Sequence, residues 1–121
     1  MIPAKTPKLI RRTLTDFVWN LPNPDNTIFL TFDDGPVPEV TPWVLDVLKS
    51  LDVKATFFCV GENISKHPGI FNRVLNEGHS IGNHTYNHLN GWRTDLNSYS
   101  ENITKTEDVL KEHGVDSRLF R

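Results

Sequence analysis

The feature that most constrains this chain is a short apolar segment that leads into two adjacent carboxylates. Residues 27–30 are apolar or β-branched, which predicts a buried strand that extends to about residue 33. Asp33 and Asp34 follow, and the Gly35-Pro36 pair after them predicts a turn. Two acids at the end of a buried strand carry a large desolvation cost unless a positive partner lies beside them. A metal ion is the simplest such partner.

The rest of the chain alternates predicted helices with predicted strands. In chain order, these are a helix starting at Thr41-Pro42 and running to about 50, a strand over 54–60, a helical turn over 63–67, a helix from about 70 that stops at Gly78, a strand over 79–82, a helix from a Ser98/Glu101 capping box to Gly114, and a strand over 118–121. Because the strands alternate with helices and are apolar on both faces, we expect an α/β fold with a parallel sheet and right-handed crossovers.

The composition is that of an ordinary globular domain and argues against some function classes. With 121 residues, of which 37% are hydrophobic, the chain is long enough for one core. The formal net charge of -2 provides no electrostatic footprint for nucleic acid, and no apolar run approaches the ~20 residues that span a bilayer. Cys59 is the only cysteine, so no internal disulfide forms, and its apolar neighbours predict a core position.

The N-terminal residues 1–26 are expected to form an arm in front of a domain that spans 27–121. Residues 8–19 have a loosely helical apolar spacing interrupted by basic residues, so we expect a short helix or an extended arm that packs under the domain. Residues 1–5 lack the apolar core of a secretory signal. This predicts a cytoplasmic chain, or a secreted or cell-envelope chain if an export segment was removed.

A second polar cluster follows the third predicted strand. His84 and His88 are four residues apart, and on a helical turn both imidazoles would lie on one side, within reach of one cation. Because active sites gather at the carboxyl ends of parallel strands, we expect this cluster to lie beside Asp33 and Asp34. Two histidines and one carboxylate are a recurrent catalytic metal set, which leaves positions for water.

Each motif alone has a less specific explanation. A single His-x-x-x-His pattern is usually surface chemistry, and an Asp-Asp pair after a strand also occurs in phosphoacceptor domains that hold magnesium. A phosphoacceptor domain needs its acceptor aspartate at the end of the third strand, where this chain has Gly82-Asn83-His84. The joint arrangement therefore favours a metal centre.

The two clusters resemble the first two signature motifs of the polysaccharide deacetylases (NodB-like, carbohydrate esterase family 4). The matching segments are residues 31–35 (Thr-Phe-Asp-Asp-Gly) and 84–88 (His-Thr-Tyr-Asn-His), and the resemblance covers about 27–121. Residues 119–121 (Leu-Phe-Arg) are similar to the start of the third motif. The resemblance implies a distorted (β/α) barrel, of which this chain would supply about half, truncated at the C-terminal side.

The resemblance also implies roles for individual residues. Asp34, His84 and His88 would hold a divalent metal, most simply Zn²⁺, with Co²⁺, Ni²⁺ or Fe²⁺ as alternatives. Asp33 would be the general base for a metal-activated water, and Arg121 would hold and tune that base. The implied reaction is hydrolytic removal of N-acetyl groups, or of O-acetyl groups, from glycans that contain N-acetylglucosamine, such as chitin oligomers or peptidoglycan.

Other interpretations stay open. The family's later motifs have no counterpart in this sequence, so a non-catalytic sugar- or metal-binding module is the alternative function. If the protein ends at Arg121, we expect negligible turnover from this chain alone. An open half-barrel would expose a sheet edge, which predicts self-association through that edge. Tyr86 and Trp92 either form a sugar-stacking wall or pack against the core or the loop. His79 is expected to be packed or hydrogen-bonded rather than a ligand.

Overall fold

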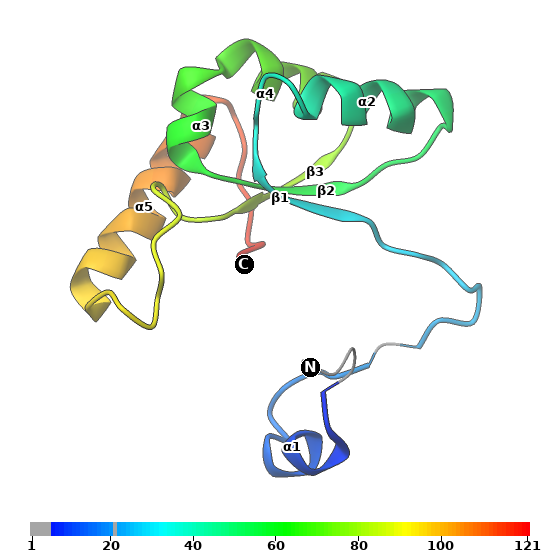
Figure 1. Ribbon diagram of the computed structural model, residues 1–121, viewed down its shortest axis with the longest axis vertical. Coiled ribbons are helices and arrows are strands. Elements are labelled where there is room, and N and C mark those ends of the chain that lie inside the picture. Colours follow the sequence, from blue (N-terminus) through cyan, green and yellow to red (C-terminus); the bar gives the residue numbers. More distant parts are fainter. Residues whose placement is uncertain (1–5, 21) are drawn as a thin grey trace.

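A small parallel sheet is the centre of the fold. The computed structural model describes residues 6–20 and 22–121, and Figure 1 shows how the elements are arranged. Within these residues the strands are β1 (Thr31–Gly35), β2 (Thr56–Cys59) and β3 (Ser80–Asn83), in the order β1-β2-β3. Both pairings are parallel, which confirms the α/β topology expected from the alternating pattern.

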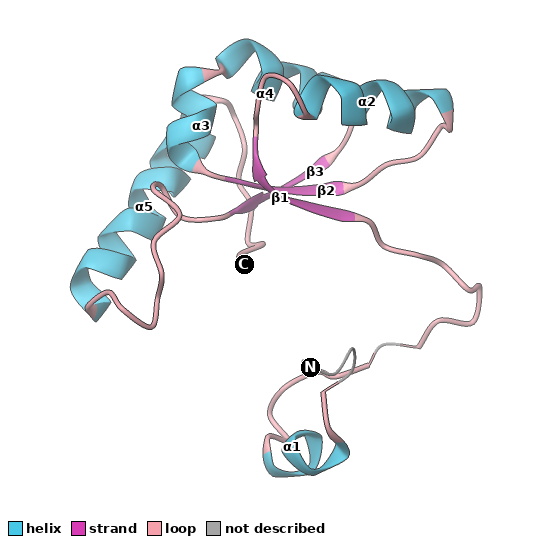
Figure 2. Cartoon of the chain, viewed as in Figure 1, coloured by secondary structure: helices cyan, strands magenta, loops and turns pink. Residues whose placement is uncertain are grey.

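Five helices accompany these strands in the described part of the chain. Their bounds are α1 (Lys8–Thr13), α2 (Thr41–Ser50), α3 (Gly61–Lys66), α4 (Pro68–Asn76) and α5 (Leu96–Glu112). Figure 2 shows α2, α3 and α4 together on one side of the sheet. The start of α2 at Thr41-Pro42 agrees with the prediction, because the fixed φ of proline suits the first turn of a helix.

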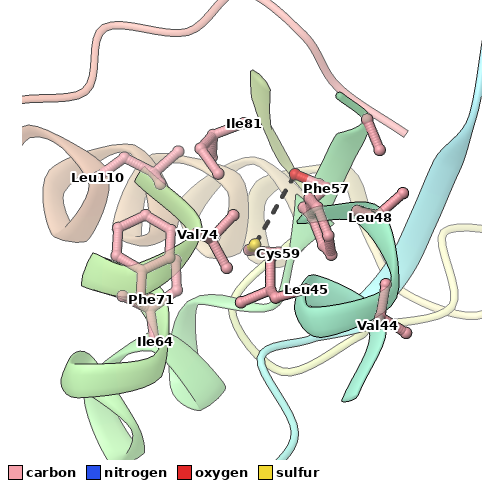
Figure 3. Close-up of a cluster of buried hydrophobic side chains, with 11 residues drawn as sticks. Val44, Leu45, Leu48, Phe57, Cys59, Ile64, Phe71, Val74, Ile81 and Leu110 are labelled. Atoms are coloured by element: carbon pink, nitrogen blue, oxygen red, sulfur yellow. Dashed lines mark hydrogen bonds between the residues drawn. The ribbon is translucent and has the colours of Figure 1, made fainter. Parts of the chain in front are cut away.

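The hydrophobic core lies between the sheet and its helices (Figure 3). Its buried side chains come from the sheet region and from α2 to α5: Val44, Leu45, Leu48, Ala55, Phe57, Cys59, Ile64, Phe71, Val74, Ile81 and Leu110. Full burial of a large apolar side chain contributes about 1.5–3 kcal/mol. Cys59 is 1% exposed, as predicted, and burial raises the pKa of its thiol to about 12. This core packs the strands against the helices, whereas the register of the β1–β2 pairing shifts between Phe32 and Gly35, around the two acids.

The segment before β1 is not the buried strand that its composition predicts. Ile28 and Phe29 are 82% and 81% exposed, and β1 begins only at Thr31. The Leu30 oxygen accepts a hydrogen bond from the Thr56 amide at 3.0 Å, which marks where pairing with β2 starts. Among the described residues β1 has a strand neighbour on one side only. Residues 27–30 therefore have no surface against which to bury their apolar side chains.

The start of α5 also differs from the prediction. Ser98 and Glu101 do not form the expected capping box, because the helix begins at Leu96 with Asp95 as its N-cap. The Asp95 carboxylate accepts a hydrogen bond from the Ser98 amide at 3.0 Å, and this bond lowers the pKa of the Asp95 carboxyl. The Asp95 side chain thus satisfies the Ser98 amide at the start of the helix, and no capping box is required there.

The predicted strand over 118–121 is reduced to a single parallel bridge between Phe120 and Asn83, at the end of β3. The Asn83 amide donates to the Leu119 oxygen at 2.8 Å, and the Arg121 amide donates to the Asn83 oxygen at 3.1 Å. This short pairing brings Arg121 to the carboxyl end of the sheet.

The N-terminal arm does not pack under the sheet as expected. α1 buries none of its residues and lies away from the sheet in Figure 1. The expectation about an export signal concerns residues 1–5, which lie outside the described residues. Among the helices of the described chain, none has the length and apolarity needed to cross a membrane.

Candidate metal centre

The acid pair lies at the carboxyl end of β1 and divides between two sets of partners. Asp34 has a φ of 69°, in the left-handed region that non-glycine residues rarely occupy. Asp34 faces two histidines, whereas its neighbour Asp33 faces Arg121. The Asn63 side chain on α3 donates to the Asp34 main-chain oxygen at 2.8 Å. This contact helps to hold Asp34 in its strained conformation.

The histidine pair lies on a loop and not on the helical turn that its spacing suggests. β3 ends at Asn83, and beyond it Thr85 and His88 have φ values of 61° and 54°. The Asn83 side-chain oxygen accepts from the Thr85 amide at 2.9 Å, and the Thr85 hydroxyl accepts from the Leu89 amide at 3.2 Å. The rings of His84 and His88 have centroids 5.0 Å apart. Reversals of the loop backbone, rather than helical periodicity, bring the two rings together.

The same loop is docked on the amino end of α3. The first amides of that helix, those of Gly61 and Glu62, donate to the oxygens of Thr85 and Tyr86, each at 3.0 Å. Amides at the start of a helix have no partner inside the helix, so the loop satisfies them. A Cβ at Gly61 would lie 2.6 Å from the Tyr86 ring, and glycine permits this close approach.

Asp34, His84 and His88 converge on one point. Oδ1 of Asp34 lies 3.2 Å from Nε2 of His84 and 3.0 Å from Nε2 of His88. One potential ligand atom from each residue lies within 4.8 Å of the others. Ligands held at about 2.0–2.1 Å by a tetrahedral zinc ion are roughly 3.4 Å apart. The spacing of these three side chains therefore fits a single metal ion.

The hydrogen bonding of His84 supports the same interpretation. Its Nδ1 contacts the main-chain oxygen of Arg121, and because that oxygen can only accept, Nδ1 carries the proton. If the ring is neutral, Nε2 then presents a lone pair to the Asp34 carboxylate, which is also an acceptor. Two acceptors 3.2 Å apart repel unless a proton or a cation lies between them. A metal-ligating histidine commonly donates its other ring nitrogen to a carbonyl in this way.

Asp33 has separate partners beside this cluster. Nη1 of Arg121 lies 3.4 Å from Oδ1 of Asp33 and donates to the Thr31 hydroxyl at 3.0 Å. The guanidinium also lies over the Phe58 ring, with Cζ 4.8 Å from the ring centroid. Because the ion pair is partly exposed, it contributes little to stability. Its consequence is positional, since these contacts hold the carboxylate of Asp33, the residue before Asp34, against the Arg121 side chain.

The remaining candidates from the sequence have different outcomes. His79 is 8% exposed and its Nδ1 accepts from the Ala55 amide at 3.2 Å, so it is packed and hydrogen-bonded as predicted. The Tyr86 ring packs against Gly61 and carries the Lys105 ammonium 3.7 Å from its centroid, which disfavours a role in sugar stacking. Trp92 is 99% exposed, so the suggested sugar-stacking wall reduces to this one side chain.

Sequence reasoning assigned no role to Asn63 or Asn83. Asn83 is 3% exposed, and its side-chain amide also donates to the Ile103 oxygen at 3.0 Å, which ties the loop to α5. A signal existed for Asn83, because a polar residue between a buried strand and a candidate ligand needs a partner. Asn63 offered no such signal, since its contact with Asp34 spans 29 residues of chain.

The sequence of this chain is similar to a family model and to several named proteins. Residues 20–121 match the family model described as polysaccharide deacetylase. A peptidoglycan-N-acetylglucosamine deacetylase from Bacillus cereus is 49% identical over 116 residues, which cover 93% of this chain and 54% of the relative. A chitooligosaccharide deacetylase from Rhizobium leguminosarum bv. trifolii is 41% identical over 86 residues, which cover 71% of this chain and 40% of the relative.

A solved structure agrees in fold. The family 4 acetyl xylan esterase from Clostridium thermocellum, solved in complex with a cobalt ion, is 37% identical with a TM-score of 0.70. The match covers 77% of this chain and 46% of the esterase. This chain thus spans about half the length of these three proteins, and its β/α units correspond to part of the NodB-like barrel, as predicted. The chain belongs to the polysaccharide deacetylase family.

Proposed function

We propose that this chain carries the metal-binding side of the active site of a glycan deacetylase. The reaction is hydrolysis of N-acetyl groups on polymers that contain N-acetylglucosamine. The observation that carries the proposal is the convergence of Asp34, His84 and His88. A further carboxylate, that of the preceding residue Asp33, is paired with Arg121.

The names of the relatives support this substrate class. The relative that matches 93% of this chain is named for peptidoglycan, so peptidoglycan is the first candidate substrate. Chitin oligomers are the second, because another relative is named for chitooligosaccharides. The acetyl xylan esterase keeps O-acetyl groups as a further acyl target.

The three converging residues would hold a divalent cation, with Zn²⁺ as the first choice. Two imidazoles and one carboxylate leave a fourth tetrahedral position for water or substrate. The cobalt ion of the related esterase supports Co²⁺ as a substitute, and the same ligands suit Ni²⁺ or Fe²⁺. When bound, the ion would lower the pKa of a water molecule and polarise the acetyl carbonyl.

The residues around the cluster would handle the proton. Asp33 adjoins a ligand but faces Arg121 rather than the histidines, so its carboxylate remains available to accept a proton from the attacking water. The Arg121 side chain would hold Asp33 in place, while its main-chain oxygen orients the ring of His84. Arg121 would therefore connect the base side of the site to the metal side.

Metal content and acetate release test the proposal together. After loading with Zn²⁺ and dialysis, the chain is expected to retain about one ion, and Asp34→Ala to retain almost none. Acetate release is then measured on peptidoglycan, chitin oligomers and acetylated xylan, and we expect the largest release from peptidoglycan. Retention of the ion without any acetate release would favour the alternative, a non-catalytic sugar- or metal-binding module. Failure to retain any divalent ion would refute the metal centre.

A further inference from the structure

One side chain on α5, that of Asn102, holds the loop that carries both histidines. Its Oδ1 accepts hydrogen bonds from the Tyr86 amide at 2.6 Å and from the Asn87 amide at 3.0 Å. Its Nδ2 donates to the side-chain oxygen of Asn87 at 3.1 Å. Tyr86 and Asn87 are two of the residues between His84 and His88. A single amide group thus makes three contacts with the segment that separates the two histidines.

Asn102 is able to hold this loop because its helix is anchored in the core. Thr106 and Leu110, which follow it at helical spacing, are 0% and 2% exposed. Asn102 itself is partly buried, inside a helix that runs over Leu96–Glu112. Asparagine is a weaker helix former than alanine, since its side chain competes for backbone hydrogen bonds. Its presence in the interior of α5 is explained if its amide serves the loop.

The loop needs such a contact because its backbone is not relaxed. Thr85 and His88 flank the residues that Asn102 contacts, and both have positive φ. Residues in this conformation persist only where their surroundings over-determine them. The amides of Tyr86 and Asn87 lie outside any helix or strand, so without Asn102 they would turn toward water. The flanking φ angles would then relax, and the two imidazoles would shift relative to Asp34.

We propose that Asn102 is a positioning residue for the divalent metal. It sets the separation of His84 and His88, so that both Nε2 atoms meet Oδ1 of Asp34. Asn102 does not touch the ligand atoms and acts through the main chain of Tyr86 and Asn87. This inference rests on the metal site of the proposed function.

Co²⁺ binding, followed by visible absorption, tests this role without any measurement of activity. Asn102→Ala removes all three hydrogen bonds and is expected to weaken Co²⁺ affinity about 10- to 100-fold, the range for lost outer contacts of metal ligands. It should also change the absorption bands, which report ligand geometry. Asn102→Asp keeps both acceptor bonds but loses the donation to Asn87, so it is expected to bind Co²⁺ only about threefold more weakly than the unsubstituted chain. Asn72→Ala, at an exposed asparagine on α4, is the matched control and should change neither readout.

Thermal unfolding in EDTA separates positioning from folding. If Asn102→Ala lowers only the melting temperature and leaves the affinity and bands unchanged, Asn102 is structural and the inference is wrong. Should Asn102→Ala not fold, Asn87→Ala decides, because Asn87 is exposed and its loss removes one of the three bonds. That variant is expected to bind Co²⁺ about threefold more weakly, and unchanged binding would contradict the inference. If the unsubstituted chain binds neither Co²⁺ nor Zn²⁺, the proposed metal site fails first and this inference falls with it.

Discussion

His79 and His84 lie at opposite ends of β3, and their Nδ1 atoms have opposite hydrogen-bonding roles. Beside the amino end of the strand, Nδ1 of His79 accepts from the Ala55 amide, so the proton of the neutral ring lies on Nε2. Beyond the carboxyl end, Nδ1 of His84 donates to the Arg121 oxygen, so Nε2 keeps a lone pair when the ring is neutral. Whether an amide or a carbonyl contacts Nδ1 therefore decides whether Nε2 is a donor or a candidate ligand.

The surroundings of the His79 and His84 rings also differ, in polarity and in charge. The His79 ring lies edge-on to Phe57 with centroids 5.2 Å apart, and burial together with the Lys54 charge lowers the pKa of His79. Nε2 of His79 has no hydrogen-bond partner within the described structure. Nε2 of His84 instead faces the Asp34 carboxylate. The amino end of the sheet thus disfavours positive charge, whereas the carboxyl end attracts it.

The largest expected effect comes from a substitution that tests whether Asp33 and Asp34 have separate roles. Asp33→Asn keeps the shape of the side chain but removes its ability to accept a proton. We expect it to lower acetate release about 10²- to 10⁴-fold while it retains the metal ion. Steady-state acetate release and metal content of the same sample are the measurements. Loss of the ion from Asp33→Asn would contradict separate roles for Asp33 and Asp34.

Substitution of the histidine at each end of β3 tests directly whether the two residues differ in their contribution to Zn²⁺ affinity. His84→Ala removes a proposed ligand and is expected to weaken Zn²⁺ affinity by more than about 100-fold, beyond the effect of outer contacts. His79→Asn keeps an acceptor for the Ala55 amide and should leave Zn²⁺ affinity unchanged. Competition with a chromogenic chelator measures both variants. Equal losses in both would show that the two ends of the strand do not differ as proposed.

Arg121 contacts both sides of the site, because its main-chain oxygen binds His84 and its side chain binds Asp33. A substitution that changes only the side chain tests the two contacts separately. Arg121→Lys keeps the charge and the main-chain oxygen that orients His84, but it loses the guanidinium, whose Nη1 donates to both Thr31 and Asp33. We expect about tenfold slower acetate release with little change in metal affinity. A loss of metal affinity as large as that of His84→Ala would mean that the side chain, and not the main chain, orients the ligand.

The smallest expected effect concerns stability at the amino end. The folded-state pKa of His79 lies below its ordinary value of 6.5, so the unfolded chain binds more protons there. The contribution of His79 to stability is therefore complete above pH 6.5 and declines as the pH falls below 6.5 toward the folded-state pKa. Urea unfolding of the metal-free chain across this range should show a smaller decline for His79→Asn, which cannot be protonated. An identical pH dependence in both chains would contradict this account.

Local sequence signals were sufficient for most of the sheet and its helices. Gly78, predicted to stop a helix, has a φ of 77° just after α4 ends at Asn76. Residues 27–30 misled for a physical reason, because an apolar composition predicts burial only where a neighbouring surface exists. The Asp95 cap was missed in favour of Ser98, since both residue types are good caps and only the folded chain shows which one is used.

By itself, the sequence determined the order of the strands and helices, the two motifs and the family to which they belong. The elements follow from apolar periodicity and turn residues, and each motif is a run of neighbouring residues. All of these signals can be read within a few consecutive residues. Only the tertiary structure decided how Asp33 and Asp34 divide, which tautomer His84 adopts and how Asn102 holds the loop. Those outcomes depend on hydrogen bonds that join residues 15 to 88 positions apart, and such contacts exist only after the helices have packed on the sheet.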